Sequence, residues 1–133
     1  MTLLIYAITG LAVTWLAYAG YMYIATRTSE GRSAEALYPL FPALSGRNGV
    51  SLVYCFTAAC RPCRPMSLEV DRLIEQGAPI YKLDLQANPE IAREYGIRAT
   101  PTLMVVQDGV ISRMLLGVKT RQAMQQLIDG PDR

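Results

Sequence analysis

The sequence predicts an α/β protein in which helices flank a mixed β-sheet, with a single apolar helix preceding this domain. Three observations support this fold class. Residues 50–130 alternate between short apolar runs and segments of helical periodicity, in the order β-α-β-α-β-β-α. Strands separated by helices favour parallel pairing, whereas the last two strands flank a short turn that is typical of an antiparallel hairpin. The stretch from Leu3 to Ala25 contains no charged residue.

The uncharged N-terminal stretch is predicted to be a transmembrane anchor, residues 1–26. As a helix it would be about 35 Å long at roughly 1.5 Å per residue, which is enough to cross a hydrocarbon core of about 30 Å. The alternative is a cleaved signal peptide with Ala17-Tyr18-Ala19 as the cleavage site. The anchor is favoured because the apolar run continues through Ala25 and no Lys or Arg precedes it.

One face of the predicted membrane helix carries small side chains at helical spacing. These residues are Ala7, Gly10, Thr14 and Ala17. Small residues let a second helix approach closely in lipid, so we expect a partner helix on this face in addition to contact with the lipid bilayer. The alternative is that the stripe only reflects the high frequency of small residues in membrane helices.

The charges that follow the predicted helix bear on which side of the membrane the domain occupies. Arg27 and Arg32 lie on its C-terminal side, and the positive-inside rule then favours a cytoplasmic domain. Glu30 and Glu35 offset these charges, so a domain on the external side is the alternative.

Composition excludes several classes of function. The formal net charge is +2 and no basic stripe with interleaved aromatic residues is present, so nucleic acid is not an expected partner. Histidine is absent, which excludes mechanisms with an imidazole base and metal sites with an imidazole ligand. Three cysteines do not make a disulfide framework.

The segment 27–49 is predicted to be a juxtamembrane linker and lead-in. Its first part is polar, and a continuation of the membrane helix by a turn or two is the alternative. An apolar part, Leu37 to Leu44, is broken by two prolines and is expected to pack on the domain as a short helix or an irregular segment. A turn cluster, Ser45 to Gly49, precedes the first strand.

The elements of the domain, residues 50–130, follow from periodicity and from helix-end signals. Asn88 is expected to cap one helix and Thr120 to start another, and Asp108-Gly109 is expected to form the hairpin turn. The predicted elements are a buried strand at Val50 to Phe56, a helix at Met66 to Glu75, a strand at Pro79 to Leu85, a helix at Pro89 to Tyr95, strands at Thr102 to Val106 and Val110 to Leu116, and a closing helix from Thr120 that ends at Gly130-Pro131.

The motif Cys60-Arg61-Pro62-Cys63 lies between the first strand and the first helix of the domain. A helix N-terminus stabilises a thiolate, and the thiolate is the nucleophile in disulfide chemistry. A thiol–disulfide redox site is therefore our first hypothesis. A zinc site would need four ligands, and no second CxxC or histidine supplies them. A purely structural disulfide stays open as an alternative.

Two further features surround the motif. Arg61 and Arg64 add positive charge that would favour a thiolate, although solvated charges at a helix start are an equal interpretation. Cys55 lies in an apolar strand and is interpreted as a buried small hydrophobic residue, with a third redox role as the alternative.

At this point the residues resemble the thioredoxin family over about Val50 to Ile128. A CxxC alone is weak evidence, but its combination with the later run of motifs is specific. The matching motifs are Cys60-Arg61-Pro62-Cys63, Lys82-Leu83-Asp84, Asn88-Pro89, Tyr95-Gly96-Ile97-Arg98, Thr100-Pro101-Thr102, Asp108-Gly109 and Gly117.

The resemblance implies a thioredoxin-like fold, with a mixed four- to five-stranded sheet, and roles for particular residues. Cys60 would be the attacking thiol and Cys63 the buried resolving thiol. Pro101 would be a cis-proline that holds substrate backbone, and Thr100 would touch the substrate. Lys82 would be a buried, supporting lysine, with an ordinary surface lysine as the alternative.

The remaining implications concern the surface and the cofactor. Arg61 and Pro62, between the two cysteines, complete the expected substrate-binding surface. No cofactor is expected beyond the redox-active disulfide itself. Two residues depart from the family pattern, since Tyr54 stands where an acidic residue is frequent and Ala59 where Trp is frequent.

These expectations combine into one function and one alternative. The function is a membrane-anchored thiol–disulfide oxidoreductase that exchanges disulfides with a protein partner through Cys60 and Cys63. The alternative is a non-catalytic accessory subunit of a membrane protein complex, in which the domain serves as a binding module.

Overall fold

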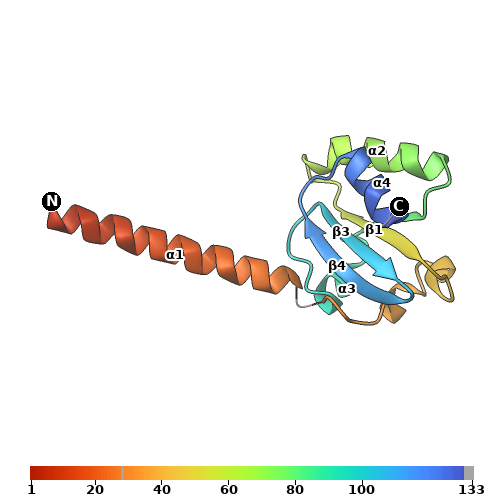
Figure 1. Cartoon of the computed structure of the whole chain (residues 1–133), viewed down its shortest axis with the longest axis horizontal. Coiled ribbons are helices and arrows are strands. Elements are labelled where there is room, and N and C mark those ends of the chain that lie inside the picture. The colour runs from red at the N-terminus through yellow and green to blue at the C-terminus, as the bar shows by residue number, and fades with distance from the viewer. Residues whose placement is uncertain (28, 131–133) are drawn as a thin grey trace.

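The computed structural model describes residues 1–27 and 29–130, and its elements follow the predicted order (Figure 1). The hairpin turn is formed by Asp108 and Gly109, both with positive φ, and a Cβ at Gly109 would meet the Tyr38 hydroxyl at 2.9 Å. The elements are α1 (Thr2–Arg27), the 3-10 helices η1 (Glu35–Leu37) and η2 (Pro42–Leu44), β1 (Val50–Phe56), α2 (Cys63–Glu75), β2 (Ile80–Asp84), α3 (Pro89–Glu94), β3 (Thr102–Gln107), β4 (Val110–Leu116) and α4 (Arg121–Asp129).

The sheet is mixed, with four strands in the order β2-β1-β3-β4. The predicted parallel pairing holds for β1 and β2, in which Tyr54 is opposite Lys82. β1 and β3 are antiparallel, with Cys55 opposite Thr102, and β3 and β4 form the predicted hairpin. The fold class predicted from the sequence is therefore confirmed, with β1 at the centre of the sheet.

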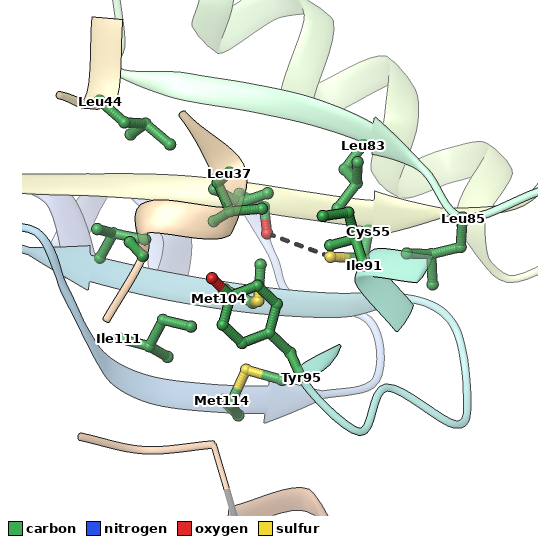
Figure 2. Packing of buried hydrophobic residues seen from close by; sticks show 13 residues of the cluster. Leu37, Leu44, Cys55, Leu83, Leu85, Ile91, Tyr95, Met104, Ile111 and Met114 are labelled. Carbon is green, nitrogen blue, oxygen red and sulfur yellow. Dashed lines mark hydrogen bonds between the residues drawn. The ribbon is translucent and has the colours of Figure 1, made fainter. Parts of the chain in front are cut away.

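Side chains alternate along β1 between two separate cores, because successive residues of a strand point to opposite faces. Tyr54 packs with residues of α2 and α4 on one face. Cys55 packs with α3 and the lead-in segment on the other face (Figure 2). The α2/α4 core contains Leu52, Tyr54, Cys63, Met66, Val70, Leu73, Ile80, Leu103, Val105 and Met124. The opposite core contains Ala34, Leu37, Leu44, Val53, Cys55, Leu83, Leu85, Ile91, Tyr95, Met104, Val106, Ile111 and Met114.

The lead-in segment contributes directly to the second core. Leu37 and Leu44 lie in the two short 3-10 helices and are buried, which confirms that this apolar part packs on the domain. The polar part before it also joins the sheet, because the Gly31 N–H donates to Ile111 O at 2.7 Å and Ser33 forms a bridge with Val110. The segment therefore extends the edge of the sheet beside β4.

Thr120 was predicted to start α4 and Asn88 to cap α3, and the second of these predictions was wrong. Thr120 caps α4, since its hydroxyl accepts a hydrogen bond from the Ala123 N–H at 3.1 Å. Asn88 precedes α3 without capping it. Its side chain instead donates to the Asp84 carbonyl at 2.9 Å, because it turns back toward the end of β2. Pro131, predicted beyond the end of α4, lies outside the described residues.

Among the described residues, one helix is long and apolar enough to cross a membrane. It spans Thr2–Ala25 with a mean hydropathy of 1.7, and an N-terminal signal sequence has the same properties. This helix, α1, projects away from the domain (Figure 1), and most of its large apolar side chains are exposed. It is therefore a candidate membrane anchor.

Candidate active site at the Cys60–Cys63 pair

The two cysteines lie where β1 leads into α2. Cys63 is the first residue of α2, and Cys60 lies in the loop before it. Their sulfur atoms are bonded at 2.08 Å, with a Cα–Cα distance of 5.3 Å. Cys63 is buried, with 2% of its surface exposed, whereas Cys60 is partly exposed. A partner can therefore reach Cys60 more easily than Cys63.

The start of α2 supplies a donor to the exposed sulfur. The Cys63 N–H points at Cys60 Sγ with an N–S distance of 3.2 Å. The N-terminus of a helix also carries a partial positive charge. When the disulfide is reduced, both effects stabilise a thiolate on Cys60, which is the nucleophilic form of the thiol.

Three exposed residues surround the pair on the solvent side. Arg61 and Pro62 separate the cysteines, and Arg64 follows them in the first turn of α2. The predicted substrate surface residues Arg61 and Pro62 are therefore accessible beside Cys60.

The loop with Thr100 and Pro101 lies at the same end of the sheet as the cysteine pair. The Thr100–Pro101 peptide bond is cis, Pro101 is buried and Thr100 is partly exposed. This loop leads into Thr102, which pairs with Cys55 near the end of β1. The Gly117 N–H donates to the Pro101 carbonyl at 2.9 Å, which ties the loop to the end of β4.

Tyr54 connects β1 to the first turn of α2. Its ring is fully buried, and its hydroxyl lies 3.0 Å from the Cys63 carbonyl and 2.7 Å from Ser67 Oγ. Burial raises the pKa of Tyr54 above its ordinary value, so the phenol is neutral around pH 7. Sequence reasoning missed Ser67, although its position one turn after Cys63 places both on the same side of the helix.

Lys82 lies at the edge of this region, on β2. Its side chain is 34% exposed rather than buried, and its Nζ donates to Asp71 Oδ1 of α2 at 2.8 Å. The same ammonium lies 5.4 Å from the centre of the Phe56 ring, which stacks on Tyr54. Lys82 therefore supports the packing of α2 on the sheet from a partly solvated position.

Cys55 occupies a different environment from the pair. It is fully buried in the core that α3 and the lead-in segment cover, and Figure 2 shows it among Leu37, Leu83 and Ile91. Burial raises the pKa of the Cys55 thiol to about 12. These properties agree with its interpretation as a small hydrophobic residue. Among the described residues, no cluster of His, Cys, Asp and Glu side chains is arranged as a metal site.

The end of α1 contacts the loop that precedes Pro101. Arg98 donates to the Tyr21 hydroxyl at 2.9 Å, and its guanidinium lies 5.6 Å from the centre of the Tyr21 ring. A small pocket beside this contact is lined by Met22 together with Ala99 and Thr102. The candidate anchor therefore meets the domain at the end of the sheet where the cysteine pair lies. The sequence carried no signal for this contact.

Comparison with known proteins agrees with this geometry. The thioredoxin family model matches residues 42–130. A thioredoxin of Bacillus subtilis is 33% identical over 81% of this chain and 97% of its own length. Thioredoxin 2 of Chlorobaculum tepidum is 30% identical over 75% of this chain and 95% of its own length. Among solved structures, a mutant thioredoxin from Halobacterium salinarum is similar, with a TM-score of 0.59, 31% identity, and coverage of 65% of this chain and 78% of its own.

Proposed function

Since the chain belongs to the thioredoxin family, we propose that it is a membrane-anchored thiol–disulfide oxidoreductase that exchanges disulfides with a protein partner. The observation that carries this proposal is the asymmetry of the cysteine pair. Cys60 is partly exposed, and its Sγ accepts a hydrogen bond from the Cys63 N–H. Cys63 itself is buried.

The asymmetry supports a sequence of two exchanges. The Cys60 thiolate attacks a disulfide of the partner, so that a Cys60–partner bond forms and the other partner sulfur leaves as a thiolate. Cys63 then loses its proton to solvent and attacks Cys60 Sγ, which restores the Cys60–Cys63 bond and releases the second partner sulfur. The partner gains two electrons and the pair loses two. A dithiol reductant returns the pair to its reduced form, and the same steps in reverse oxidise a partner dithiol.

The partner would bind across the loops that surround Cys60. The loop with Thr100 and Pro101 leads into Thr102, which is opposite Cys55 near the end of β1, and Arg61 and Pro62 are exposed beside Cys60. We assign substrate contacts to Thr100, Pro101, Arg61 and Pro62, and no cofactor besides the redox-active disulfide.

Membrane anchoring through α1 adds a geometric constraint to the reaction. Because the Tyr21–Arg98 contact lies at the same end of the sheet as the pair, an α1 that spans a bilayer would direct this end of the domain, with Cys60, toward the membrane surface. This arrangement favours a partner that is itself at the membrane. Arg27 and Arg32 favour the cytoplasmic side for the domain.

Reduction of insulin by dithiothreitol, followed by turbidity, tests the proposed activity. Wild-type protein is expected to accelerate the reaction, and Cys60→Ser is expected to abolish the acceleration. Cys55→Ala is the matched control, since it removes a buried thiol that the mechanism does not use. A wild-type protein that is no faster than Cys60→Ser would overturn the proposal.

The exposed α1 is the observation that supports the alternative function, an accessory subunit of a membrane complex. Its small-residue face, formed by Ala7, Gly10, Thr14 and Ala17, is open to a partner helix. Purification from membranes distinguishes the two functions. The alternative would be supported by a stoichiometric membrane partner that co-purifies with Cys60→Ser as well as with wild-type protein, together with wild-type protein that does not accelerate insulin reduction.

A further inference from the structure

The Tyr54 hydroxyl has a defined hydrogen-bond direction. The Cys63 carbonyl can only accept, so the single phenolic proton of Tyr54 is donated to it over 3.0 Å. Ser67 must then donate its hydroxyl proton to Tyr54 Oη over 2.7 Å. The result is a chain of two hydrogen bonds that joins the first two turns of α2 to the centre of the sheet.

The end of this chain is the backbone of the buried cysteine. While the disulfide is closed, the bond to Cys60 also restrains Cys63. Reduction of the pair breaks that covalent restraint but involves no atom of the Tyr54–Cys63 hydrogen bond. The stacked Phe56 ring, 5.5 Å away between ring centres, keeps the Tyr54 ring itself in place.

From this geometry we propose that Tyr54 is a positioning residue for the second exchange, in which Cys63 attacks the Cys60–partner disulfide. This inference rests on the proposed function. Tyr54 touches no reacting sulfur in the structure, and it acts by holding the Cys63 backbone where Cys63 Sγ can reach Cys60 Sγ. It remains neutral during the reaction and does not take up the Cys63 proton.

The chain contains a matched control for this residue. Tyr95 is a second buried tyrosine whose hydroxyl donates to a backbone carbonyl, that of Ser33, at 3.0 Å. It lies in the opposite core, away from the pair. Tyr95→Phe therefore removes a comparable hydrogen bond without touching the first turn of α2.

Reaction of the reduced full-length protein with the aromatic disulfide 5,5′-dithiobis(2-nitrobenzoate) separates the two exchanges. In the first phase, Cys60 attacks the reagent, forms a mixed disulfide and releases one thionitrobenzoate. In the second phase, Cys63 attacks that mixed disulfide, forms the Cys60–Cys63 bond and releases the other thionitrobenzoate. Cys63→Ser is expected to lack the second phase, and Cys60→Ser reports any reaction of the other two thiols.

Tyr54→Phe is expected to slow the second phase about three- to tenfold, which corresponds to the loss of one neutral hydrogen bond, and to leave the first phase unchanged. The pH at which the second phase reaches half its maximum rate is expected to stay the same. Tyr95→Phe is expected to change neither phase. Ser67→Ala, which keeps the Tyr54–Cys63 bond, is expected to slow the second phase less than Tyr54→Phe and serves as the second variant if Tyr54→Phe does not fold.

Three results would overturn the positioning role. These are a second phase of Tyr54→Phe at the wild-type rate, an equal slowing of both phases, or a shifted pH profile that assigns proton transfer to the phenol. If Tyr54→Phe does not fold, a wild-type second phase in Ser67→Ala counts against the role. A wild-type protein without the two phases would instead contradict the proposed function itself.

Discussion

The two faces of the sheet place cysteine in opposite chemical environments. On the face covered by α2 and α4, the pair meets solvent at a helix N-terminus, and the Cys63 N–H contacts Cys60 Sγ. On the other face, Cys55 is enclosed by apolar side chains and its pKa is raised to about 12. Because the residue type is the same on both faces, we expect exposure and nearby donors to decide which thiol reacts.

Selective alkylation is expected to show the largest difference between the thiols of the two faces. Raising the pKa of Cys55 from 9.0 to about 12 lowers its thiolate fraction near neutral pH about 1000-fold, and burial blocks reagents as well. We expect iodoacetamide to modify Cys60 in the reduced native protein and to leave Cys55 unmodified until the protein unfolds. Peptide mass mapping measures this, and modification of Cys55 within tenfold of the Cys60 rate would contradict the comparison.

Truncating one large side chain on each face should separate stability from activity. Leu37→Ala and Met66→Ala each remove a fully buried side chain, and each is expected to lower the free energy of unfolding by about 2–5 kcal/mol. Only Met66→Ala, in the core that contains Cys63, is expected to slow disulfide exchange per folded molecule. Urea unfolding and the insulin assay measure the two effects. A loss below about 1 kcal/mol for Leu37→Ala would show that the lead-in segment is dispensable for the core.

Alkaline pH is expected to lower the stability that the buried Cys55 thiol contributes to its core. Its folded-state pKa is raised, so its contribution to stability is complete below the unfolded-state pKa and is lost as pH rises from about 9 toward 12. Wild-type protein is therefore expected to lose stability relative to Cys55→Ala by roughly 1 kcal/mol per pH unit in this range. Urea unfolding at each pH measures the difference between the two proteins. A difference that does not change with pH would contradict a neutral buried thiol.

The smallest effect is expected at the exposed edge of the α2 face. Lys82 and Asp71 have side chains that are 34% and 49% exposed, and exposed ion pairs contribute only about 0–1 kcal/mol. Lys82→Met is therefore expected to lower the free energy of unfolding by less than about 1 kcal/mol, and by less at high salt. Chemical denaturation at two salt concentrations measures this. A salt-independent loss above about 2 kcal/mol would assign Lys82 a buried role.

Much of the fold was predictable because strong local signals agreed with it. The hairpin followed from Asp108-Gly109, whose backbone adopts positive φ at both positions. The junction of strand and helix at Cys60 followed from an apolar run before it and helical periodicity after it. Both features depend on neighbours in sequence, which is the information that a single sequence carries best.

The contacts that could not be predicted join residues far apart in the chain. Gly31 pairs with Ile111 through backbone atoms, so no side-chain pattern marks the added edge of the sheet. The Tyr21–Arg98 contact and the Tyr54–Ser67 hydrogen bond depend on how helices are placed against the sheet. The Asn88 prediction was wrong, since its side chain accepts no hydrogen bond from the start of α3 and its amide nitrogen donates to the Asp84 carbonyl instead.

The central claim is that Cys60 attacks and Cys63 resolves. Cys63→Ser protein that is reduced and then incubated with oxidised insulin tests it most directly, because the first exchange can occur and the second cannot. We predict a covalent complex that is joined through Cys60 in peptide mass mapping and that does not form with Cys60→Ser. A complex joined through Cys55, or one that forms equally well with Cys60→Ser, would contradict the account.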